Sequence, residues 1–149
     1  MKTTLAILLL LVVLPGAAPT SDESPASVRF ATVDVQIDTK GKPLAAYQVE
    51  FIADAKQVKL VGIEGGDHAA FKQTPYYDPA ALSKNRVIVA AFNTGSDLPK
   101  SSFRAARLHV QITGPANEKP KWESKLIVAA AADGSSIPAV VTLQEGAQP

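Results

Sequence analysis

The sequence predicts an all-β fold: a two-sheet antiparallel β-sandwich, preceded by a signal-peptide helix. Three observations lead to this prediction. Short runs rich in β-branched residues alternate apolar and polar positions with a period of two, as strands with one buried face do. Gly, Pro, Asn and Asp separate these runs at short intervals. Seven such runs lie between residues 28 and 143, a strand density typical of a sandwich.

Residues 1–18 have the features of a secretory signal peptide. Lys2 is followed by ten consecutive apolar residues, 5–14, and then by small residues up to Ala18. Ten residues of helix reach only about 15 Å, half of the roughly 30 Å hydrocarbon core, so a spanning helix is not expected. We expect a bacterial protein exported to the periplasm or secreted, with cleavage after Ala18. Pro19 after the cut is unfavourable, so an uncleaved membrane anchor is the alternative.

The remaining chain divides into a leader, one domain and a tail. Residues 19–27 are polar and proline-containing and predict a flexible leader, and residues 145–149 predict a flexible tail. Residues 28–144 form the sandwich domain. Its first three strands are predicted at 28–38, 44–53 and 58–63. In the first, Ala31, Val33, Val35 and Ile37 share one face, and in the second Tyr47, Val49 and Phe51 do.

Four more strands are predicted at 86–92, 103–113, 123–132 and 139–143. The strand at 103–113 has the clearest alternation, with Ala106, Leu108, Val110 and Ile112 on one face and Arg107, His109 and Gln111 on the other. The connection 65–85 before these strands is long for a plain loop. Within it, residues 78–82 predict one helical turn, because Asp78 can cap and Pro79 suits the first helical position.

Composition excludes several classes of function. The chain has no cysteine, which removes disulfides, thiolate metal sites, cysteine nucleophiles and a lipidated cysteine. Cleavage after Ala18 would remove Lys2 and leave 14 basic against 14 acidic side chains, a formally neutral domain. We therefore expect no nucleic-acid partner, and no membrane contact beyond the N-terminal signal.

Two stretches resemble the cohesin family. Residues 46–67, AYQVEFIADAKQVKLVGIEGGD, resemble its strand, Tyr-Asp-Pro-type corner, strand and acidic glycine turn; here the corner reads Ala53-Asp54-Ala55, without the proline. Residues 98–114, LPKSSFRAARLHVQITG, resemble its later strongly alternating strand. Cohesins are similar in fold to a class of cellulose-binding modules. The resemblance implies an immunoglobulin-like sandwich that binds or scaffolds and does not catalyse.

Polar residues in and beside the long connection raise the question of a metal or catalytic site. Glu64, Asp67, His68 and Asp78 are oxygen and imidazole donors, but their spacing matches no established ligand motif. Gly65-Gly66-Asp67 is equally good turn chemistry. The chain has no G-x-S-x-G elbow, no H-E-x-x-H and no phosphate-binding loop. We expect no catalytic residues, no metal and no cofactor, and carry Asp67 and His68 only as ligand-binding candidates.

Aromatic residues are the stronger binding candidates. Tyr76, Tyr77 and Trp122 combine flat apolar faces with polar tips in or beside loops, as contact residues do. The alternative is that Tyr77 and Phe71 pack inward and pin the connection onto the sandwich, and that Trp122 closes one end of the core. Arg107 lies on a polar strand face, where Glu50 or Asp34 could pair with it; a recognition patch with Arg104 is the alternative.

We therefore expect an exported, non-catalytic module that binds a protein partner at or outside the cell envelope. A polysaccharide-binding module is the alternative. An exposed coplanar aromatic pair would favour the polysaccharide, and a flat, apolar, exposed sheet face would favour the protein. The sequence does not specify an oligomeric state.

Overall fold

The computed structural model describes residues 27–146, and they form an all-β fold. The signal peptide, most of the leader and the last three residues of the tail lie outside the described residues. Seven strands and two short 3₁₀ helices follow one another along the chain: β1 (Ser27–Asp38), β2 (Ala46–Ala53), β3 (Val58–Gly65), η1 (Ala69–Phe71), η2 (Pro79–Ala81), β4 (Arg86–Phe92), β5 (Ser102–Gly114), β6 (Trp122–Ala130) and β7 (Val140–Glu145).

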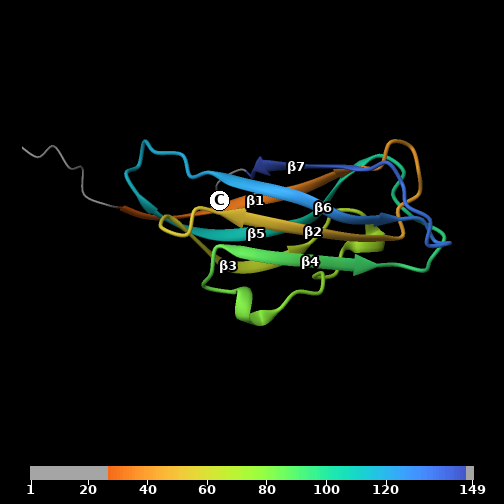
Figure 1. The fold of residues 1–149 in the computed structure, drawn as a ribbon, viewed down its shortest axis with the longest axis horizontal. Coiled ribbons are helices and arrows are strands. Elements are labelled where there is room, and N and C mark those ends of the chain that lie inside the picture. The colour runs from red at the N-terminus through yellow and green to blue at the C-terminus, as the bar shows by residue number, and fades with distance from the viewer. Residues whose placement is uncertain (1–26, 147–149) are drawn as a thin grey trace, which may run out of the picture.

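The strands form two antiparallel sheets, which confirms the predicted sandwich (Figure 1). One sheet has the order β3-β5-β1-β7 and the other β4-β2-β6. Strand β5 pairs with β1 along its whole length, from Ser27 to Asp38, whereas β7 pairs only with Val33–Asp38. The edge strands β3 and β4 are joined by the long connection, which runs along one side of the sandwich.

The core lies between the sheets, and the side chains that the period-two pattern predicted to face inward fill it. Val33, Val35 and Ile37 of β1 have no exposed surface, and Leu108 and Val110 of β5 have none either. Strand β2 contributes Tyr47, Val49 and Phe51, all nearly fully buried. The predicted outward side chains of β5, Arg107, His109 and Gln111, lie on the opposite face. Burial of each large apolar side chain contributes about 1.5–3 kcal/mol, so this core is the main stabilising term.

A β-bulge at Ala105 ties the two sheets together. In the β1–β5 register, Val35 faces Ala106 and Gln36 faces Arg104, so Ala105 is the extra residue. Its freed carbonyl accepts a hydrogen bond of 2.9 Å from the Tyr47 hydroxyl, which reaches across from the other sheet. Burial raises the pKa of Tyr47, so the phenol stays protonated and donates this bond at all ordinary pH values.

Among residues 27–146, no helix is long and apolar enough to cross a membrane.

Replacement of Tyr47 by Phe should destabilise the domain. The variant removes the donor and leaves the fully buried Ala105 carbonyl unsatisfied, a loss of about 1–3 kcal/mol in the free energy of unfolding. Urea unfolding followed by circular dichroism measures it. The matched control is Tyr76→Phe, because the Tyr76 ring is exposed; that change should stay within about 0.5 kcal/mol of wild type. Equal effects of the two substitutions would contradict this role of Tyr47.

Candidate functional site

The connection from β3 to β4 begins with two glycines that the structure requires. A Cβ on Gly65 would lie 2.1 Å from the Lys72 carbonyl oxygen, and one on Gly66 would lie 2.2 Å from the Arg104 carbonyl oxygen. Gly66 N–H donates to the Phe71 carbonyl at 2.8 Å and closes the first turn. The glycines are therefore explained by close backbone approach and not by a ligand.

Asp67 and His68, both binding candidates in the sequence, hold the connection in place. Asp67 Oδ1 accepts from the Arg104 backbone N–H at 2.9 Å, and the Asp67 N–H donates to the Arg104 carbonyl at 3.1 Å. His68 caps η1, since its Nδ1 accepts from Ala70 N–H at 3.1 Å. Its ring also meets Phe103 edge-on, with centroids 6.1 Å apart. Both side chains therefore have a structural role in holding the connection.

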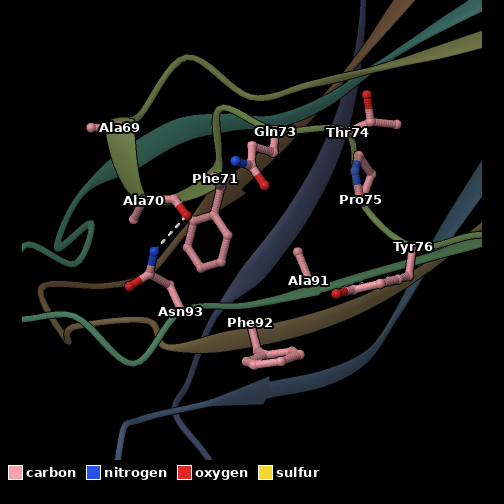
Figure 2. A pocket seen from close by; sticks show the side chains of 10 residues that line it. All are labelled: Ala69, Ala70, Phe71, Gln73, Thr74, Pro75, Tyr76, Ala91, Phe92 and Asn93. Atoms are coloured by element: carbon pink, nitrogen blue, oxygen red, sulfur yellow. Dashed lines mark hydrogen bonds between the residues drawn. The ribbon is translucent and has the colours of Figure 1, made fainter.

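Phe71 is the aromatic anchor of the connection, as its inward packing alternative predicted. It is buried, lies edge-to-face with Tyr47 at 5.2 Å between centroids, and stacks on Phe103 at 5.7 Å. Asn93, just after β4, donates from Nδ2 to the Ala70 carbonyl at 2.9 Å (Figure 2). The connection is thus fixed to both sheets through its first helix.

The four polar residues considered for a metal site are not assembled into one. Among residues 27–146, no group of three or more His, Asp or Glu side chains is placed to hold a metal ion. Glu64 Oε1 lies 2.8 Å from Nε2 of His109, which stands diagonally from it on β5, opposite Gly62. Asp78 Oδ1 instead accepts from Ala80 N–H at 2.9 Å and caps η2, as the sequence predicted for this turn.

Tyr76 is the aromatic candidate that the connection presents to solvent. Its backbone pairs with Ala90 of β4 through two hydrogen bonds, of 2.7 and 2.9 Å. Its ring is 71 % exposed and lies beside Phe92, which is 65 % exposed. The two rings are parallel within 10°, with centroids 6.2 Å apart (Figure 2). Two parallel rings in direct face contact would have their centroids about 3.5–4.0 Å apart. These two rings are therefore displaced sideways, and together they form an extended apolar surface.

Phe92 was missed in the sequence, although a signal was present. In the run RVIVAAF, alternation places Val87, Val89 and Ala91 inward, and the final Phe92 therefore outward. A large aromatic residue on the wet face of a strand end is a candidate contact residue. Phe92 ends a strand and lies in no loop, so it was not among the predicted contact aromatics.

Tyr76 and Phe92 border a shallow apolar surface on the outer side of the three-stranded sheet. Sheet register places Ala46 beside Phe92 and Gln48 between Ala90 and Val128. A hollow of about 200 Å³ is lined by these side chains together with the two rings. We call this surface the aromatic face; it consists of Tyr76, Phe92, Ala46, Ala90 and Val128. On the other side of the rings, a second hollow of about 390 Å³ is lined by Gln73, Thr74 and Asn93, among others (Figure 2).

Tyr77 and Trp122 do not join Tyr76. Both are half-buried and pack against the core, the inward packing considered for each. Trp122 pairs with Ala53, whereas the strand pairs place Tyr76 level with Gln48 of β2. Five residues of strand separate these positions, roughly 17 Å at about 3.3 Å per residue. The three aromatics therefore form no common platform.

The outer side of the four-stranded sheet carries charged pairs. Arg107 donates from Nε and Nη2 to the two Asp34 carboxylate oxygens at 2.7 and 2.9 Å. Arg104 Nη1 lies 4.0 Å from the same carboxylate. These contacts confirm the cross-strand pairing of Arg107, with Asp34 as the partner; Glu50 pairs with Arg86 instead. The hydrogen bond from Arg107 holds the pKa of Asp34 below its usual range, and the Asp34 carboxylate raises the pKa of Arg107.

Comparison with known proteins finds no relative: no protein-family model, no curated protein and no solved structure matches the chain. The resemblance to cohesins remains a prediction from the sequence.

Asp34→Asn should reduce the acid sensitivity of the fold. Because the folded pKa of Asp34 lies below its unfolded value of 3.8, the carboxylate stabilises the native state above that value. This contribution is lost as the pH falls through the folded pKa. The wild type should therefore be more stable than Asp34→Asn at neutral pH, and the difference in urea midpoint should shrink below pH 3.8.

The control for this experiment is Asp97→Asn, which changes an exposed carboxyl group in a loop. Its urea midpoint should follow the wild type across the same pH series. A constant difference between wild type and Asp34→Asn from neutral to acid pH would contradict a stabilising carboxylate at Asp34.

Proposed function

We propose that this chain is an exported, non-catalytic binding module that docks a protein partner on its aromatic face. The observation that carries the proposal is the pair Tyr76 and Phe92, both more than 60 % exposed and parallel on one sheet face. Tyrosine and other aromatic side chains are enriched where proteins bind one another. Monomeric surfaces seldom gather such residues without a partner.

The aromatic face is held rigid before any partner arrives. Tyr76 is fixed by its two backbone bonds to Ala90, and the Pro75 before it is buried. Phe92 is followed by Asn93, whose N–H donates to the Ala45 carbonyl at 2.8 Å. Little conformational entropy remains to be lost on binding, and preorganisation of this kind raises affinity.

The surroundings of the two rings favour a protein over a sugar. Ala46, Ala90 and Val128 make a shallow, mostly apolar floor with Gln48 among them, which suits a partner's own apolar side chains. A sugar requires several hydrogen-bonding groups around the rings; here Gln48 lies in the floor of the hollow, and the amide of Asn93 beside Phe92 is already used. Asn93 donates from Nδ2 to the Ala70 carbonyl and accepts at Oδ1 from Gly95 N–H.

A polysaccharide ligand is the second candidate. It is supported by the near-parallel orientation of the rings, on which a sugar ring could lie, and by Gln73 and Thr74 in the adjacent hollow. Export is supported by the charged start and apolar run of residues 1–18. The cohesin-like stretches favour the same reading, a module that binds or scaffolds.

Tyr76→Ser and Phe92→Ser should each weaken binding to the partner. The mature domain, immobilised, would be exposed to the secreted proteins of its source organism, and its captured partner titrated against each variant. Loss of a central aromatic contact of about 2 kcal/mol lowers affinity roughly thirtyfold. Val61→Ser is the matched control, because Val61 is an exposed apolar residue of β3, in the other sheet.

Retention on insoluble polysaccharides, measured with the same four proteins, separates the two candidates. Sugar retention that both serine variants lose would replace the protein partner by a polysaccharide. If every captured protein binds Phe92→Ser as well as wild type, the aromatic face is not the docking surface.

A further inference from the structure

Strand β1 has an unpaired edge over its first residues. Strand β5 covers its other edge from Ser27 onward, but β7 ends at Glu145, opposite Val33. Gly146 adds one more bond, its N–H donating to the Thr32 carbonyl at 2.9 Å. Backbone groups alternate in direction along a strand, so the N–H and C=O of Phe30 and Val28 point to the same side as the Thr32 carbonyl. No strand of the described part of the chain lies there.

A cleft opens directly beside this edge, where β7 ends and β6 begins. Its volume is about 340 Å³; Arg29, Ala31, Ile112, Pro120 and Trp122 line it, together with the charged residues Glu118, Lys119 and Glu145. Alternation along β1 directs Arg29 and Ala31 to the cleft, and Val28 and Phe30 to the outer side. Val28 and Phe30 are 59 % and 62 % exposed. Apolar surface therefore lies on both faces of residues 28–31, next to the backbone N–H and C=O groups that no described strand pairs with.

Two polar side chains beside the cleft, Arg29 and Thr32, differ in their bonding. The Arg29 guanidinium donates to the carbonyls of Glu118, at 2.8 Å, and Pro115, at 3.4 Å, but within residues 27–146 it forms no ion pair with a carboxylate. Thr32 is 9 % exposed, and its buried hydroxyl has no hydrogen-bond partner within the same range. Arg29 is half-exposed and already bonded to two carbonyls, so what it lacks is an opposite charge, whereas the Thr32 hydroxyl is closed to solvent beside Gly146.

We propose that an extended segment of a partner protein adds to β1 as a strand, antiparallel, alongside residues 28–31. The open backbone groups of Phe30 and Val28 require an extended backbone opposite them, which excludes a helix or a sugar. The partner residue opposite Ala31 carries an apolar side chain into the cleft, beside Trp122 and Ile112. The residue opposite Arg29 carries a carboxylate, which supplies the missing ion pair.

This surface is independent of the aromatic face. Strand β1 begins at one end of the long axis of the molecule, and β4 ends with Phe92 at the other (Figure 1). Variants of the two surfaces can therefore be tested separately.

Trp122 is the single tryptophan of the chain and lines the cleft, so its fluorescence reports on occupancy directly. The probe is a capped seven-residue peptide that alternates threonine and valine, with glutamate replacing the central valine. A second peptide carries lysine at that position. The full mature domain should bind the glutamate peptide at least tenfold more tightly than the lysine peptide. Arg29→Glu should reverse this preference, and Arg29→Gln should bring the two affinities within about threefold.

Phe92→Ser should leave the peptide titration unchanged, which separates this proposal from the docking of a protein on the aromatic face. A glutamate peptide with N-methyl groups on its backbone should not bind, because it lacks the donors that β1 requires. The proposal is overturned if Trp122 emission does not saturate with either peptide, or if Arg29→Gln keeps the wild-type preference. It is also overturned if binding occurs only in a chain ending at Gly146, since residues 147–149 would then be the occupant.

Discussion

The bulge at Ala105 is the point on which the arrangement of this domain depends. It turns the Ala105 carbonyl out of the β1–β5 ladder and towards Tyr47, so one buried hydrogen bond joins the two sheets. The residue before it, Arg104, uses its N–H and C=O to hold Asp67. The same short stretch of β5 therefore sets both the contact between the sheets and the start of the connection. In a regular strand these backbone groups would form hydrogen bonds within the sheet, and the contacts with Tyr47 and Asp67 would not form.

From this anchor the connection protects two sheet edges. Tyr76 pairs with Ala90 on the free side of β4, and Ser83 and Lys84 bond to Leu60 on the free side of β3, both at 2.7 Å. Ser83 adopts a φ of 67°, a left-handed conformation that costs a non-glycine residue about 1–2 kcal/mol, and the pairing with Leu60 offsets it. Proteins commonly cover or charge exposed edges to prevent unwanted strand pairing. The start of β1, in contrast, has no such cover among residues 27–146 and has an apolar cleft beside it. Its open edge is therefore available to pair with a strand of another protein.

The sequence predicted the features that depend on local pattern. Alternation identified the buried faces of β1, β2 and β5, and capping chemistry identified the turn at Asp78. It did not predict the partners of Asp67 and His68, because these partners are backbone and ring atoms that only sheet topology brings near. The pairing of Tyr76 with Phe92 was inaccessible for the same reason. The contact between the two rings depends on how the connection crosses the sandwich. A separation of sixteen residues in the sequence does not determine that course.

Two surfaces at opposite ends of one rigid sandwich have a consequence that neither has alone. Beyond Ala31, strand β1 continues for seven residues, roughly 23 Å at about 3.3 Å per residue, towards the end of the sandwich where β4 ends (Figure 1). A partner strand beside Val28 and Phe30 would therefore not collide with a domain docked on Phe92. Because the Tyr47–Ala105 bond and the core fix the sheets relative to each other, the two partners would be held at a constant spacing. If both proposals hold, the module joins two proteins, and scaffolding follows from its geometry without any third surface.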